Sequence, residues 1–294
     1  MKLLLIADAE GCALYDIEKN NSKEAMCKEL SALLRKVEDL DIEITVIDAH
    51  GDGHNIDSLI NCFPEVTFVH HLWSLHDYDY DAAILIGFHA KAQEKSKNAH
   101  TIRPEIKNLS LGSVSVGEVT LLINWLSYYS IPVVFISGEK ELCKEIEGLR
   151  IPYYLYEMGG GESKIKRMCD QAFVALGQNS YIQYYQNDPV QIYFWEHVYH
   201  DFIPSCIGKD MTDYIVFSNT MIFMELLPVL SELINAAHSM QIVCLNRLRY
   251  LKKYETDQLN RLQDLMGNLF VYDKAKLSSQ AYQNILRASY EKTY

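Results

Sequence analysis

Short apolar runs alternate with amphipathic stretches along the first 176 residues of the chain. The apolar runs have the length of buried strands, and the longer stretches repeat apolar residues at the three- and four-residue spacing of a helix. The predicted strands span residues 2–7, 43–47, 82–86, 132–137 and 151–156, and the predicted helices span residues 22–40, 116–129, 139–147 and 162–176. This alternation predicts an α/β fold with a mostly parallel sheet flanked by helices.

The pattern changes after residue 176. Of the 20 tyrosines, 15 follow residue 150, and strands and helices alternate less regularly. Strands are expected at residues 190–195 and 213–218, and helices at 220–240 (kinked at Pro228), 241–269 and 275–290. The chain is therefore expected to have three parts: an α/β metal-binding domain (1–176), a smaller mixed strand and helix part (177–240) and an added helical tail (241–294).

Composition and charge narrow the functional class. The 294 residues include 27 basic and 39 acidic ones, which gives a formal charge of −12. Nucleic-acid binders are usually basic, so no nucleic-acid partner is expected. No apolar stretch has the length of a membrane span or of a signal peptide's apolar part, so no membrane partner is expected. The seven cysteines form no Cys-x-x-Cys pair, and their odd number indicates a reducing, cytoplasmic environment.

Acidic and histidine side chains follow three of the predicted strands. Asp8 and Glu10 come directly after the first strand, His50 follows the second and His89 follows the third. In an open α/β sheet the carboxyl ends of parallel strands meet at one edge, so these side chains are expected to lie together. Glu118, near the start of a predicted helix, can supply a third carboxylate.

This set of residue types favours a metal site. Crowded carboxylates repel one another unless cations neutralise them, and mixed histidine and carboxylate ligands suit zinc or a similar divalent first-row ion. A single catalytic ion needs about three protein ligands, whereas five ligands with one bridging carboxylate suit two ions. Each residue also has a purely structural interpretation, as a polar residue at a strand end or, for Glu118, as a favourable charge at a helix N-terminus.

Five short motifs around these residues resemble those of the DppA-like zinc D-aminopeptidases. The family's V-D-x-E-G appears as A-D-A-E-G at residues 7–11, its D-S-H as D-A-H at 48–50, and its G-Y-H-A as G-F-H-A at 87–90. A second family histidine follows eleven residues after the first and corresponds to His100, and V-G-E appears at residues 116–118. The resemblance extends over residues 1–240 and thins after residue 118.

This resemblance implies a hydrolase, namely a metallopeptidase that cleaves the amide bond after an N-terminal residue, typically D-alanine, in short peptides. It implies a dinuclear site with two zinc ions per subunit, whose ligands are Asp8, Glu10, His50, His89 and Glu118. Asp8 would bridge the two ions, and His100 would be a catalytic residue beside them rather than a ligand. The resemblance also implies a ring-shaped homo-oligomer with its sites facing an inner chamber.

The sequence departs from the family pattern at residues 156–163, where family members carry a basic stretch associated with the substrate. The glycines at 159–161 precede a helix, and a turn is favoured there over an anion-binding loop. Two alternatives therefore stay open: hydrolysis or transfer on a non-peptide amide in a biosynthetic pathway, and a non-catalytic, metal-stabilised scaffold. The tail at 241–294 carries no ligand set and is expected to be structural or to contact another subunit.

Further histidines lie outside these motifs. His54 follows His50 closely and can line the pocket or lie in a solvated loop. His70, His71 and His76 lie near acidic residues. They can form a surface metal cluster or be solvated. Their spacing matches no regular ligand pattern, which favours the solvated alternative.

Overall fold

The computed structural model describes residues 1–75, 77–157, 161–178, 184–195, 215–228, 230–231 and 234–235. The chain divides into two compact units, one of Met1–Ile192 with Val216–Leu227 and one of Tyr193–Ile215 with Pro228–Tyr294. Most of the second unit lies outside the described residues, as do both helices expected in the tail and residues 158–160. The domain boundaries expected after residues 176 and 240 therefore stay predictions.

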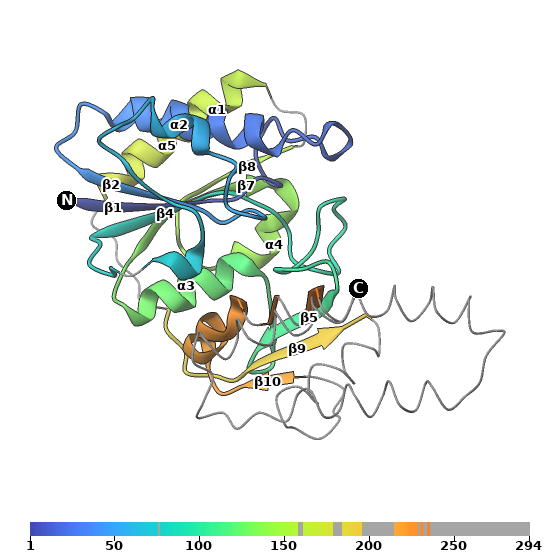
Figure 1. Ribbon diagram of the computed structural model, residues 1–294. Helices are drawn as coiled ribbons and strands as arrows, with labels where there is room; N and C mark the ends of the chain where they lie inside the picture. The colour runs from blue at the N-terminus through green and yellow to red at the C-terminus, as the bar shows by residue number, and fades with distance from the viewer. Residues whose placement is uncertain are drawn as a thin grey trace, which may run out of the picture. The chain divides into compact units, whose positions relative to one another are not determined.

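A six-stranded parallel sheet lies at the centre of the first unit (Figure 1). Its strands are β1 (Lys2–Ala7), β2 (Glu43–Asp48), β3 (Thr67–Val69), β4 (Ala82–Phe88), β7 (Val133–Glu139) and β8 (Tyr153–Tyr156). Their spatial order is β3-β2-β1-β4-β7-β8, and neighbouring strands are parallel. The predicted α/β fold is confirmed. Because the chain adds strands outward from β1 and then outward from β4, these two strands flank the point where the strand order reverses.

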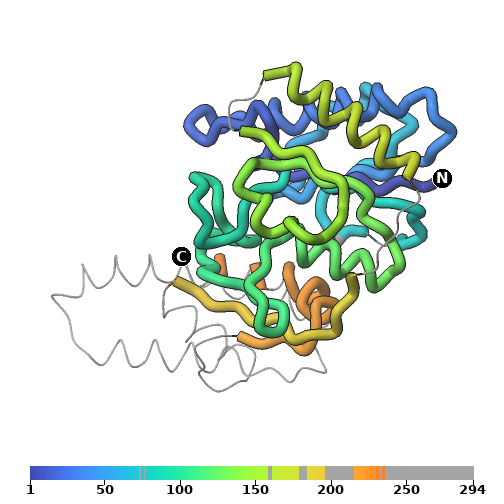
Figure 2. Tube along the Cα trace, turned by 180° about the vertical axis from the view of Figure 1, so that it is seen from behind, coloured from blue at the N-terminus to red at the C-terminus, as the bar shows by residue number. Residues whose placement is uncertain are grey.

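Helices cover both faces of this sheet. On one face α1 (Ser22–Val37) packs beside α5 (Glu162–Leu176), as Figure 2 shows from behind. On the other face lie α3 (Glu118–Tyr128) and the short α4 (Cys143–Ile146), while α2 (Asp57–Ile60) is a single turn after β2 (Figure 1). The five apolar residues whose spacing predicts α1 are all buried in the core: Met26, Leu30, Leu33, Leu34 and Val37.

A second sheet has four strands in the order β10-β9-β5-β6. They are β5 (Ile106–Leu111), β6 (Val114–Val116), β9 (Val190–Phe194) and β10 (Ile215–Phe217). β5 and β6 form an antiparallel hairpin in which Leu109 pairs with Val116. The prediction of a helix from residue 116 is therefore wrong at its start, because Val116 belongs to the hairpin and α3 begins at Glu118.

The helix predicted over residues 139–147 is shorter than expected. β7 continues through Glu139, whose buried carboxylate accepts a hydrogen bond from the Ala90 amide at 2.7 Å. A 3-10 turn over Lys140–Leu142 follows, and α4 covers only Cys143–Ile146. The helix expected at 220–240 is present over residues 220–228, and most of its remainder lies outside the described part.

Two further findings concern the chain's environment. Among the described residues, no helix is both long and apolar enough to cross a bilayer. The cysteines in this part of the chain are unpaired: Cys12, Cys27, Cys62, Cys143 and Cys169.

Candidate metal centre

The candidate ligands lie at the carboxyl edge of the parallel sheet, where the strand order reverses. Asp8 directly follows β1, and His89 directly follows the neighbouring strand β4. The loop after β1 packs against the end of β4, and the Gly11 amide donates a hydrogen bond to the Gly87 carbonyl oxygen at 2.8 Å. A Cβ atom on Gly11 would lie 1.7 Å from the Phe88 carbonyl oxygen, so only glycine allows this close approach.

Two groups of ligand atoms meet at Asp8. In the first group, His50 Nδ1 lies 3.1 Å from Asp8 Oδ1 and 2.8 Å from Glu10 Oε2. In the second group, His89 Nε2 lies 3.5 Å from Asp8 Oδ2 and 3.3 Å from Glu118 Oε1. Ligand atoms around one tetrahedral zinc ion are roughly 3.3 Å apart. The structure thus brings all five predicted ligands together, and the two oxygens of Asp8 face different groups.

His100 lies beside the second group. Its ring stacks on the ring of His89, with 4.0 Å between centroids and 10° between planes, and its Nε2 atom is 4.0 Å from Glu10 Oε1. His100 Nδ1 donates to the Asn98 carbonyl oxygen at 2.8 Å, and the Asn98 side-chain amide donates to the Glu10 carbonyl oxygen at 2.9 Å. His89, His100 and Glu118 each offer a ligand atom within 4.8 Å of the others. The geometry alone is therefore compatible with either a ligand role or an acid/base role for His100.

The centre crowds ionisable groups into a buried place. Asp8 and His89 are buried, with exposed fractions of 3% and 4%. Burial and the neighbouring Glu10 carboxylate raise the pKa of Asp8 to about 8. Burial opposes a charge on His50, but the adjacent carboxylates of Asp8 and Glu10 raise the pKa of His50 to about 10. Burial also opposes ionisation of Glu118, yet the nearby His89 holds the pKa of Glu118 below its usual value.

Two buried carboxylate oxygens here, Asp8 Oδ2 and Glu10 Oε2, accept no hydrogen bond from the residues that the structure describes. Glu10 Oε2 lies 2.8 Å from His50 Nδ1, but the hydrogen bond of that nitrogen is to Asp8 Oδ1. Buried carboxylate oxygens without a partner are costly, and a cation among these groups removes both that cost and their mutual repulsion. His89 Nδ1 donates to the Ala90 carbonyl oxygen at 2.9 Å, which leaves Nε2 free as a ligand. The residues present therefore fit divalent metal ions.

Glu139 supports the loop between His89 and His100 and is not among the site residues that the sequence predicts. Its carboxylate is fully buried and accepts hydrogen bonds from the Ala90 amide at 2.7 Å and the Ser96 hydroxyl at 2.6 Å. Glu139 ends β7, and the pairing of β7 with β4, which no pattern in the sequence shows, places its carboxylate beside this loop. The sequence pattern instead predicts that Glu139 starts a helix.

Glu145 supports the helix that begins with Glu118. Its Oε1 atom accepts hydrogen bonds from the Gly117 amide at 2.9 Å and the Thr120 amide at 2.8 Å. These amides belong to the first turn of α3, where backbone donors have no partner within the helix. Glu145 thus fixes the helix start that presents Glu118, and no pattern in the sequence identifies this role.

Comparisons with known proteins give two matches. The model of peptidase family M55, described as D-aminopeptidase, matches residues 1–154, which include all six predicted site residues. Among solved structures, the chain is similar to the Zn-dependent D-aminopeptidase DppA from Bacillus subtilis, a self-compartmentalizing protease, with a TM-score of 0.68 and 17% identity. The alignment covers 79% of this chain and 97% of that one, and at this identity it shows a shared fold. No curated protein sequence matched.

Proposed function

The chain belongs to peptidase family M55, the D-aminopeptidases, and we propose that it is a dizinc-dependent aminopeptidase. Its proposed substrates are short peptides or aminoacyl amides whose N-terminal residue has the D configuration. Family membership supports the peptidase chemistry. The proposal of two metal ions is supported by the position of Asp8, whose two oxygens face two separate groups of ligand atoms.

Each proposed ion has its own set of ligands. Asp8, Glu10 and His50 would hold one ion, and Asp8, His89 and Glu118 would hold the other. When bound, such ions supply a Lewis acid for the scissile carbonyl and an activated water. The printed description of DppA as Zn-dependent supports the choice of zinc.

His100 is proposed as the acid/base residue of the site. Its Nδ1–H donates to the Asn98 carbonyl oxygen, so Nε2 is the atom that can exchange a proton there. Stacking on His89 fixes the ring plane, and the side chain keeps an exposed fraction of 19%, so substrate can reach it. The leaving amine of a cleaved amide needs a proton, and His100 Nε2 is placed to donate it. Asn98 also binds the backbone of Glu10 and thereby holds His100 next to the ligand loop.

We also propose a homo-oligomer, with a ring as the expected form, that acts in the cytoplasm. The description of DppA as self-compartmentalizing supports the oligomer, and unpaired cysteines in the described residues support a reducing compartment. The tail at 241–294 is proposed as a structural or subunit-contact segment. Light scattering of the full chain and of a chain ending at Met240 tests this. A soluble truncated chain with an unchanged number of subunits contradicts the proposal for the tail.

Turnover of matched D- and L-aminoacyl amides and dipeptides by the zinc-loaded protein tests the proposed activity. We expect release of the N-terminal residue, faster for the D than for the L configuration. The N-acetylated form of the best substrate is the control and should resist cleavage, because an aminopeptidase needs a free amine. If no free-amine substrate is cleaved by protein that holds both ions, the aminopeptidase proposal fails; cleavage of blocked amides alone favours a non-peptide amide substrate.

A further inference from the structure

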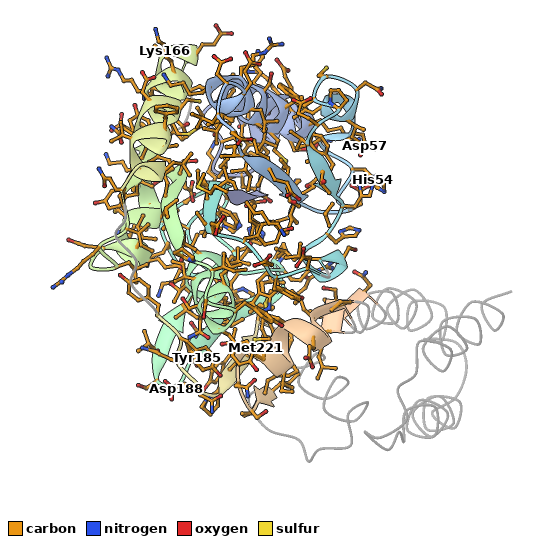
Figure 3. The ribbon with its side chains drawn as sticks, turned by 90° about the vertical axis from the view of Figure 1, so that its left-hand side faces the viewer. His54, Asp57, Lys166, Tyr185, Asp188 and Met221 are labelled. Carbon is orange, nitrogen blue, oxygen red and sulfur yellow. The ribbon has the colours of Figure 1, made fainter. Side chains whose placement is uncertain are left out.

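Three side chains with metal-binding groups meet at the surface, apart from the central site. His54 lies in the loop after β2, Asp57 begins α2 and His70 directly follows β3. Each offers a ligand atom within 4.8 Å of the other two. His54 Nδ1 is 3.1 Å from Asp57 Oδ2, and His70 Nδ1 is 3.6 Å from Asp57 Oδ1. Figure 3 shows His54 and Asp57 close together on the outside of the fold.

The backbone around this cluster is tightly packed. Gly53 has a φ of +71°, and a Cβ atom there would lie 1.6 Å from the His70 carbonyl oxygen. His70 Nδ1 in turn donates to the Gly53 carbonyl oxygen at 2.8 Å. On the other side of His54, the Asn55 amide donates to the buried Asp48 carboxylate at 2.7 Å. The loop that carries His54 is thus fixed both to the end of β2 and to the residue after β3.

The cluster has the ligand types and the exposure of a transition-ion site. Two imidazoles and a carboxylate suit zinc, cobalt, nickel or copper ions, whereas calcium and magnesium prefer oxygen ligands. The side chains of His54, Asp57 and His70 have exposed fractions of 52%, 49% and 45%, so water can complete the coordination. The bond from His70 Nδ1 to the Gly53 carbonyl oxygen fixes the orientation of the His70 ring beside Asp57, as backbone hydrogen bonds do for metal-binding histidines. Among the described residues, Asp57 pairs with histidines and with no lysine or arginine.

We propose that His54, Asp57 and His70 form a second cation site that binds one divalent first-row transition ion. The site shares no side chain with the central one. A hydrogen bond nevertheless joins the loops that carry the two sites, because the Asn55 side chain donates to the His50 carbonyl oxygen at 2.7 Å. An ion at the surface therefore ties the segment after β3 to the loop that presents His50.

Zinc binding by the full chain and by matched variants tests this site. Asp57→Asn removes the charge of the ligand while keeping the size of the side chain. Asp52→Asn makes the same change at an exposed aspartate of the same loop that is not one of the three ligands; asparagine keeps the side-chain oxygen that accepts a hydrogen bond from the His54 amide at 3.3 Å. Asp8→Ala provides a protein in which the central ions are expected to be lost. Equilibrium dialysis over a series of free zinc concentrations, followed by metal analysis, gives the number of ions bound and their affinities.

We expect Asp57→Asn and His54→Ala each to weaken one zinc-binding step by at least about tenfold. Removing a residue that only hydrogen-bonds to a ligand already lowers metal affinity by about tenfold or more, and these two residues are proposed as ligands themselves. Asp52→Asn should bind zinc as the unmodified protein does. The same step should persist in Asp8→Ala and disappear when Asp57→Asn is added to it. Identical binding curves for the unmodified protein and Asp57→Asn overturn the proposal. An equal loss in Asp52→Asn also overturns it, since that result indicates general surface charge.

Discussion

Glu29 is a buried carboxyl group whose ionisation the fold opposes. It lies on α1 with no exposed surface, and it accepts a hydrogen bond from the Ala13 amide in the loop that follows the candidate ligand Glu10. Within the described part of the chain, its second oxygen, Oε2, accepts no hydrogen bond. Burial raises the pKa of Glu29 to about 8. The substitution Glu29→Gln keeps an acceptor for the Ala13 amide and removes the ionisable group.

The size of the effect follows from the proton that the folded state retains. The folded state holds this proton up to about pH 8, whereas an unperturbed glutamate releases it near pH 4.5. The stabilising contribution of protonated Glu29 is therefore complete below pH 4.5 and is lost as the pH rises through 8. Each pH unit in this interval corresponds to about 1.4 kcal/mol, so the unmodified protein should lose about 4 kcal/mol of unfolding free energy relative to Glu29→Gln between about pH 5 and pH 9.

Urea unfolding of both proteins at several pH values across this interval measures the difference. A chelator is present throughout, so that metal binding adds no pH dependence of its own. Glu24→Gln is the control, since Glu24 is an exposed residue of the same helix that pairs with Lys28 at the surface; its effect should stay below about 0.5 kcal/mol at every pH. The reasoning is refuted if the difference between the unmodified protein and Glu29→Gln changes by less than about 1 kcal/mol over the interval.

Three further substitutions probe the centre and its supports. Glu145→Ala removes the acceptor of two amides at the start of α3, so it should lower the free energy of unfolding in urea by about 1–3 kcal/mol. It should also lower the affinity for the ion nearest Glu118. Gly11→Ala places a Cβ atom 1.7 Å from the Phe88 carbonyl oxygen and should lower zinc content and stability together; an unaffected variant would show that the loop does not need this approach. His100→Ala should retain both ions in metal analysis and lower kcat by about 10²–10⁴, whereas loss of an ion would identify His100 as a ligand.

The main sheet could be predicted because its apolar runs are separated by helices with a clear period. The hairpin at 106–116 could not, because β6 is three residues long and its apolar Val116 adjoins the apolar sequence of α3. Only Gly117, in an extended conformation, separates the two elements. β3 is equally short, and its position depends on parallel pairing with β2.

The proximity of the six candidate site residues could be predicted, because five of them lie just after strands or start a helix and all lie in recognisable motifs. The role of Glu139 could not be predicted, because its hydrogen bond to the Ala90 amide depends on the packing of β7 beside β4. The surface cluster could not either, since parallel pairing of β2 with β3 and the close approach at Gly53 bring His70 to His54. The sequence grouped His70 with His71 and His76 instead, and His76 lies outside the described residues.

The number of zinc ions bound by Asp8→Ala and by Glu118→Ala tests the dinuclear centre most directly. Both variants are prepared with Asp57→Asn, so that an ion at the surface cluster is not counted. Because Asp8 contributes one oxygen to each group of ligand atoms, Asp8→Ala should lose more than one ion's share of binding, and Glu118→Ala should weaken mainly one ion. Two ions bound by Asp8→Ala with unchanged affinity would contradict a centre that shares this carboxylate.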